Sequence, residues 1–152
     1  MYRAKAVARY IIAYEHQQNR CVRNLRLQVL LYFVQAKYLV STGDPLFGTP
    51  IEAWISGPVV PLVYQEFRIF GGATIPISER TSDIHALRNE DAAIINPMLE
   101  RCANYPTTYL IGNSRKQKPW RDARSSWETN RITSKAILEY FAEDNASVKA
   151  PQ

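Results

Sequence analysis

The segment from Leu25 to about Val40 constrains the fold most, because it is apolar on most faces of a helix. A helix that is apolar nearly all round is normally enclosed by other elements. We therefore predict that it is the central helix of the domain, with Asn24 as its N-cap. The run Thr42-Gly43-Asp44-Pro45 should end it, since glycine readily adopts the left-handed cap conformation and proline forbids continuation. Its polar members occupy a minority of the helix surface: Arg26, Gln28, Gln35 and Lys37.

Shorter elements are predicted around this helix. An amphipathic helix should cover Arg3 to Gln18, and a second helix should begin at Pro61 and end near Phe70, before Gly71-Gly72. Another helix should begin at Asn89 or Asp91, and Thr133 should cap the last one. Ile51 to Ser56 looks extended and has Ala73 to Ser82 as a candidate partner strand. The expected fold class is mainly α: a single compact helical domain over residues 1–144, with one short two-stranded β element as an option. The small, polar residues 145–152 should fray.

Several function classes lack their sequence signatures. The chain of 152 residues has neither a Gly-x-Gly-x-x-Gly motif nor a Gly-Lys-Ser/Thr phosphate loop. Its only histidines, His16 and His85, lie in unrelated segments without a nucleophile motif or metal-ligand spacing. Cys21 and Cys102 suggest no disulfide framework. With no signal peptide and no membrane-spanning apolar run, the sequence predicts a cytoplasmic protein that is not an enzyme and needs no cofactor or metal.

Positive charge is concentrated in one part of the chain. The segment 115–135 holds seven basic and two acidic residues, which gives it a net charge of +5, and the remainder is balanced. A local basic patch favours an acidic partner, either a protein surface or a phosphate backbone. A solvated surface without any partner explains the same charge equally well.

Two aromatic clusters are candidate binding segments. In the first, Trp54 precedes the run Gly57-Pro58-Val59-Val60-Pro61 and is followed by Tyr64 and Phe67. Tryptophan and tyrosine are enriched at interface hot spots, but a rigid corner packed on the core is the leading interpretation of this run. In the second, the segment 118–124 interleaves Trp120 with basic residues and is followed by Trp127. Such a pattern suits nucleic acid through phosphate contact and stacking, and suits an acidic protein equally well.

These clusters and the central helix resemble one known family. The run Val22 to Gln35, the sequence Gly43-Asp44-Pro45-Leu46-Phe47, the block Ile51 to Tyr64 and the pair Pro119-Trp120 follow, in order and spacing, the pattern of the Panacea domain. This domain is found in SocA-like antitoxins and related phage-associated proteins. Two positions depart from its pattern: Val29 replaces a lysine, and the segment 113–118 is strongly basic where the family tends to carry a Thr-His pair and an acidic residue.

The resemblance implies a mostly helical domain that neutralises a toxin or other effector protein by direct contact, and some relatives act as adaptors that deliver the partner to a protease. For this chain the basic segment predicts a partner with an acidic surface. A nucleic-acid-binding regulator that uses the basic patch of residues 115–135 is the alternative. We expect the partner-binding residues to be Trp54, Tyr64, Phe67, Arg115, Lys116, Lys118, Trp120, Arg121 and Arg124.

Overall fold

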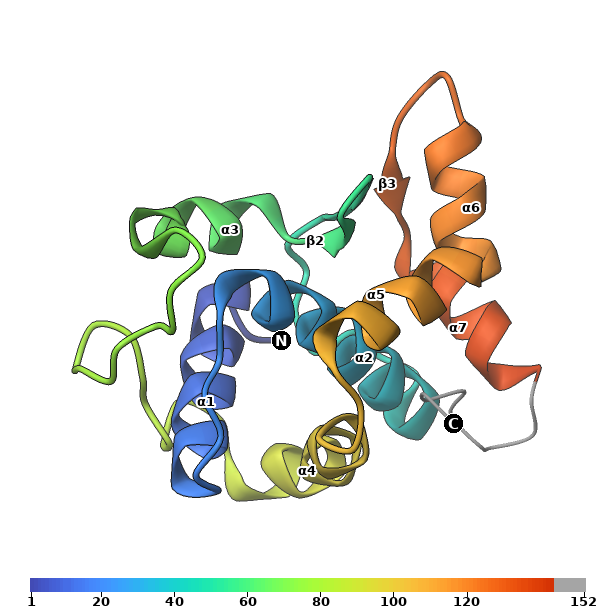
Figure 1. Cartoon of the computed structure of the whole chain (residues 1–152). Helices are drawn as coiled ribbons and strands as arrows, with labels where there is room; N and C mark the ends of the chain where they lie inside the picture. The colour runs from blue at the N-terminus through green and yellow to red at the C-terminus, as the bar shows by residue number, and fades with distance from the viewer. Residues whose placement is uncertain (144–152) are drawn as a thin grey trace.

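The computed structural model describes residues 1–143 and shows a mainly α domain built around one helix (Figure 1). The predicted fraying of 145–152 therefore lies outside the described residues. In chain order the elements are α1 (Ala4–Gln17), α2 (Asn24–Thr42), β1 (Ile51–Trp54), β2 (Gly57–Val59), α3 (Pro61–Phe67), the 3-10 helix η1 (Arg68–Phe70), α4 (Asn89–Cys102), α5 (Thr107–Lys116), α6 (Lys118–Ser125), β3 (Arg131–Ile132) and α7 (Ser134–Ala142). None of the described helices is both long and apolar enough to cross a membrane.

Helix α2 is the centre of the core, as its composition predicts. It packs against α1, α3, α4, α5, α7 and β2, and Leu30, Leu31 and Phe33 are 0% exposed. At its end Gly43 adopts φ +83°, and its N–H bonds to the carbonyl of Leu39. The predicted central position and the glycine stop are both confirmed.

The predicted N-cap at Asn24 is wrong, because its side chain serves a different purpose. Asn24 is the first helical residue and is buried; its Nδ2 donates to the carbonyl of Tyr64 (3.1 Å) and its Oδ1 accepts from Gln28 Nε2 (2.9 Å). Gln28 in turn accepts from the Val60 N–H (2.9 Å). These two polar side chains bind α2 to the start of α3, and neither lies on the exposed surface of the helix.

Two further polar residues of α2 form equivalent links. The hydroxyl of Tyr32 donates to Gln117 Oε1 (2.6 Å), which joins α2 to the junction of α5 and α6. Gln35 donates to the carbonyl of Phe47 (2.7 Å) and accepts from the Leu46 N–H (2.8 Å). All four polar positions of the Asn-x-x-x-Gln-x-x-x-Tyr-x-x-Gln pattern are therefore buried and hydrogen-bonded within the fold.

The sheet has three antiparallel strands in the order β2-β1-β3. The predicted pairing of Ile51–Ser56 with Ala73–Ser82 is wrong, because β1 pairs with the strand that follows it at once and with β3. Thr74 instead forms an isolated bridge with Arg23. Gly57 opens β2 at φ +109°, and a Cβ there would lie 3.2 Å from a methyl group of Ile111 on α5. The position needs glycine both for its backbone conformation and for the close approach of α5.

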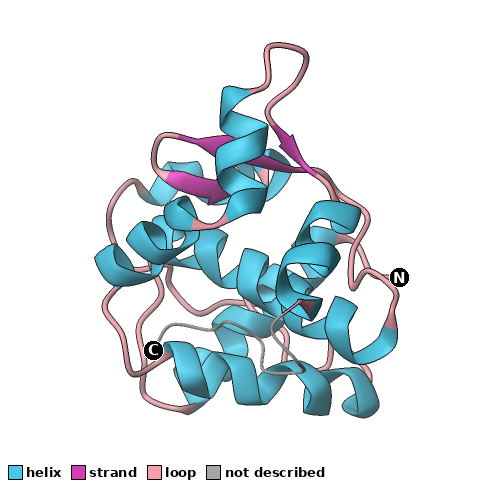
Figure 2. Cartoon of the chain, turned by 90° about the vertical axis from the view of Figure 1, so that its right-hand side faces the viewer, coloured by secondary structure: helices cyan, strands magenta, loops and turns pink. Residues whose placement is uncertain are grey.

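The first part of the basic segment, residues 115–125, is helical except at Gln117. It forms the end of α5 and the whole of α6, which packs against β1, β3 and α7; Figure 2 shows α6 crossing the sheet. Pro119 lies in the first turn of α6, where a missing N–H costs no hydrogen bond. The predicted Thr133 cap is confirmed, since its side chain accepts from the Ala136 N–H (3.1 Å).

Candidate partner-binding surface

The fold brings the two aromatic clusters of the sequence together. Trp54 on β1 and Tyr64 on α3 pack edge to face, with ring centroids 5.2 Å apart. Trp120 on α6 donates from Nε1 to the carbonyl of Trp54 (3.0 Å), and the guanidinium of Arg115 lies 5.1 Å from the centroid of its ring. Segments more than fifty residues apart in sequence thus meet at the sheet, with Trp120 bonded to the backbone of Trp54.

Exposure divides the predicted contact residues into three groups. Phe67 is 2% exposed and Trp120 is 8% exposed, so both pack in the core and are unavailable for the direct contact that the sequence suggested. Trp54 and Tyr64 are half-buried. The five basic residues are exposed: Arg115, Lys116, Lys118, Arg121 and Arg124. The ring of Trp120 thus stabilises the fold, whereas the basic side chains around it are exposed.

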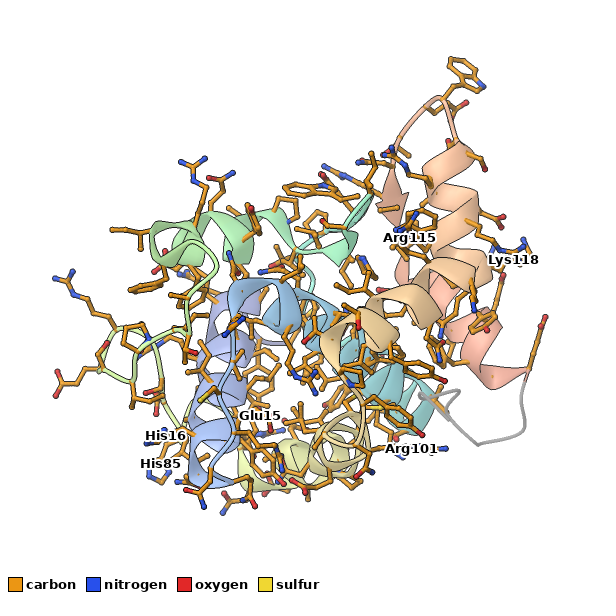
Figure 3. All side chains as sticks on the ribbon, in the orientation of Figure 1. Glu15, His16, His85, Arg101, Arg115 and Lys118 are labelled. Carbon is orange, nitrogen blue, oxygen red and sulfur yellow. The ribbon has the colours of Figure 1, made fainter. Side chains whose placement is uncertain are left out.

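The exposed charges are spread around α6. In the view of Figure 3, Arg115 and Lys118 lie on opposite sides of this helix. Lys118 forms an ion pair with Asp122 one turn later, and the hydrogen bond to that carboxylate raises the pKa of Lys118. Arg121 and Arg124 form no ion pair with any of residues 1–143. Their charge is available to a carboxylate or phosphate from outside the chain.

Beyond α6, the loop that leads to β3 protrudes from the body of the domain (Figure 2). Trp127 in this loop is 92% exposed. An exposed tryptophan is unusual on a surface without a partner, because it leaves a large apolar area in water. Its place beside the basic helix extends the candidate surface.

A groove that the sequence did not predict opens beside Tyr64. It has a volume of about 670 Å³ and lies between the first turn of α2, the α3–η1 segment and the first turn of α5. Three arginines line it, Arg23, Arg26 and Arg68, together with Leu25 and Tyr64. Leu25 begins the apolar pattern that predicts a central helix, but it is 41% exposed. Because the segment is apolar on all sides, its sequence pattern does not show which apolar residues at this end of α2 are exposed.

Arg26 is held in place by the turn between α4 and α5. Its Nη1 donates to the carbonyl of Tyr105 and to the hydroxyl of Thr107, and its Nη2 donates to the carbonyl of Cys102, each at 3.0 Å. Partial burial lowers the pKa of Arg26, because desolvation penalises the charged form. The side chain therefore fixes one wall of the groove while its charge lies in a partly dry environment.

A second buried charge has a structural role. Glu15 is 1% exposed and accepts two hydrogen bonds from Arg20, at 2.6 and 3.0 Å. Arg20 also donates to Glu100 (2.8 Å), so this network ties the end of α1 to α4.

In residues 1–143 no three His, Cys, Asp or Glu side chains are placed so that they could hold a metal ion.

Comparison with known proteins adds a family to this geometry. The family described as "Antitoxin SocA-like, Panacea domain" matches residues 27–121, from the first turn of α2 to α6. A curated relative, Antitoxin SocA of Caulobacter vibrioides (strain NA1000 / CB15N), is 41% identical over 170 residues, which cover 97% of this chain and 87% of the relative. No solved structure matches the chain significantly.

Proposed function

Since the chain belongs to the antitoxin SocA-like family with a Panacea domain, we propose that it neutralises a toxin or other effector protein in the cytoplasm by binding it directly. The proposed role is one of binding without catalysis. The observation that carries it is that β1, α3, α5 and α6 bring half-buried Trp54 and Tyr64 together with Trp120 and its exposed neighbour Arg115. Arginine, tryptophan and tyrosine are the side chains that contribute most to protein–protein affinity.

The charge of this surface and its separate anchors support a protein partner. A stable interface buries roughly 800 Å² on each side, and the basic residues around α6, the Trp127 loop and the groove beside Tyr64 together offer several separate anchors. Exposed arginines that form no ion pair within residues 1–143 favour an acidic partner, and they raise the rate of encounter more than the final affinity. We therefore propose that the partner presents an acidic surface.

The direct test is neutralisation in cells. The protein encoded beside this chain is expressed in a bacterial host with and without it, and growth and co-purification are measured. Growth that recovers together with a stoichiometric complex supports the proposal. Growth that stays inhibited, with no complex formed, refutes neutralisation of that protein by direct binding.

Charge reversal then tests the surface. Arg121→Glu with Arg124→Glu should weaken the complex and its salt-sensitive association rate, because both side chains are exposed and form no ion pair with any of residues 1–143. The matched control, Arg80→Glu with Arg101→Glu, makes the same change in net charge at exposed positions away from α6 and should bind as the unmodified protein does. Equal weakening by both pairs would show that net charge alone matters.

A nucleic-acid-binding regulator remains the second candidate, favoured by the seven basic residues between Arg115 and Lys135. It predicts an affinity for DNA that falls by about one log unit per log unit of salt for each phosphate contact. A complex that survives nuclease and responds weakly to salt would favour the protein partner.

Delivery of the partner to a protease is a further role to test, and it requires that the partner's lifetime in cells falls when this chain is present.

A further inference from the structure

We propose that the groove beside Tyr64 binds an acidic segment of the partner protein, with an apolar side chain of that segment lying against Leu25. This assignment rests on the proposed antitoxin function and names the chemistry that one part of the surface would recognise. It uses residues that the sequence-based prediction did not include, apart from Tyr64. The occupant is thus a short peptide segment that carries carboxylates on either side of an apolar residue.

The dimensions of the groove suit such a segment. A volume of about 670 Å³ falls within the range of about 300–1,000 Å³ that is usual for ligand-binding pockets. Its walls come from three elements that the core holds rigidly, since Asn24 bonds to the Tyr64 carbonyl and Arg26 bonds to the turn before α5. A preformed groove loses little conformational entropy when it is filled.

The charged residues that line the groove are all basic. Arg23, Arg26 and Arg68 line it, no acidic residue of the described part of the chain does, and none of the three forms an ion pair with residues 1–143. The first turns of α2 and α5 also border it, and helix N-termini add partial positive charge. Arg26 is already partly desolvated, and a carboxylate placed beside it would interact more strongly than it would in open water.

The apolar part of the lining favours a protein segment over a nucleic acid. Leu25 is 41% exposed and faces the groove together with the ring of Tyr64. The phosphate groups that would contact the arginines cannot cover the leucine side chain, whereas a peptide that alternates acidic and apolar residues fills both parts of the lining. Burial of a leucine-sized side chain contributes to affinity in proportion to the apolar area removed from water.

The first experiment is a titration of the full chain, followed by amide NMR, with a synthetic peptide of alternating glutamate and leucine. We expect the amides of Arg23, Leu25, Arg68 and Thr108 to shift. Arg23→Glu with Arg68→Glu should weaken binding roughly tenfold, because two exposed charge contacts become repulsive. The control pair Arg80→Glu with Arg101→Glu should bind the peptide as the unmodified chain does. Shifts confined to other surfaces, or none at all, would overturn the proposal.

Three further probes separate the chemical sources. The same peptide with glutamine in place of glutamate should bind more weakly, and inorganic phosphate should neither shift Leu25 nor compete at equal concentration. If phosphate or single-stranded DNA displaces the acidic peptide at equal or lower concentration, the groove is a phosphate site and the proposal is wrong.

Neutralisation in cells distinguishes this proposal from the function on which it rests. If the chain neutralises its partner and the Arg23→Glu, Arg68→Glu variant does so equally well, the groove assignment fails and the proposed function stands. If the chain neutralises nothing, the proposed function fails, and the peptide titration still decides whether the groove binds acidic segments. Thermal unfolding of each variant, compared with the control pair, identifies any loss that comes from misfolding.

Discussion

Gln28 offers the sharpest test of how α2 is fixed in the core. Its side chain is 1% exposed and joins two elements: Oε1 accepts from the Val60 N–H, and Nε2 donates to Asn24 Oδ1, each at 2.9 Å. Gln28→Met keeps the length of the side chain and a similar helix propensity, but it removes both hydrogen bonds. The variant therefore isolates the polar contribution from packing.

The expected loss follows from the two buried groups that remain. A buried donor or acceptor left without a partner costs about 1–3 kcal/mol, and both the Val60 N–H and Asn24 Oδ1 would be left so. Relief from burying the glutamine amide offsets part of this. We expect the free energy of unfolding to fall by roughly 2–4 kcal/mol, a large share of the total of about 5–15 kcal/mol that is usual for a domain.

The assay is urea unfolding followed by far-ultraviolet circular dichroism, with thermal melts in parallel. A domain of this size loses about 2–4 °C per kcal/mol, so the midpoint should fall by roughly 5–15 °C. The control is Gln65→Met, an identical change at an exposed position of α3, which should stay within about 0.5 kcal/mol. If Gln28→Met is as stable as Gln65→Met, the buried amide does not stabilise the fold and the reasoning is refuted.

Four other substitutions test three separate features. Gly57→Ala should cost about 1–3 kcal/mol, because φ is +109° and the added Cβ would meet α5, whereas Gly112→Ala, in a helix with open space around it, should gain about 0.5–1 kcal/mol in the same unfolding assay. Trp120→Ala should lower the melting temperature through a loss of about 3–5 kcal/mol; an unchanged melt would show that this ring is not core. The hydrogen bond from the Tyr2 hydroxyl lowers the pKa of Asp91, against desolvation, which raises it. The stabilisation that this lowered pKa provides is therefore complete above the ordinary pKa of about 4, and it is lost as the pH falls below that value. Asp91→Asn should flatten the acid limb of a curve of unfolding free energy against pH, and an unchanged limb would contradict this.

The elements predicted well are those that local chemistry specifies. The all-round apolar pattern of α2, the Gly43 stop and the Thr133 cap depend on residues within a few positions of one another. The four buried polar side chains of α2 could not be predicted in this way, because most of their partners are brought by distant segments. Gln117, the partner of Tyr32, is one example. A polar residue in an apolar helix gives no local sign of whether water or the backbone will satisfy it.

The candidate surface was only partly accessible from sequence for the same reason. The two aromatic clusters were recognised, but composition alone did not separate the buried Trp120 from the exposed basic residues around it. The second β partner, β3, has only two residues, too few to show an alternating pattern. The groove depends on Arg68 and Thr107 approaching the first turn of α2, and only the tertiary fold brings those three segments together.

The graded burial of the three tryptophans has an optical consequence. Trp127 is 92% exposed, Trp54 is half-buried and Trp120 is 8% exposed. Iodide added to the solution would collide with the first indole and hardly reach the last, so the quenchable part of the fluorescence reports on the loop beyond α6 and the protected part reports on the core. A partner that covers this loop would shield Trp127 from iodide, and the chain thereby carries its own label for docking, with no dye attached.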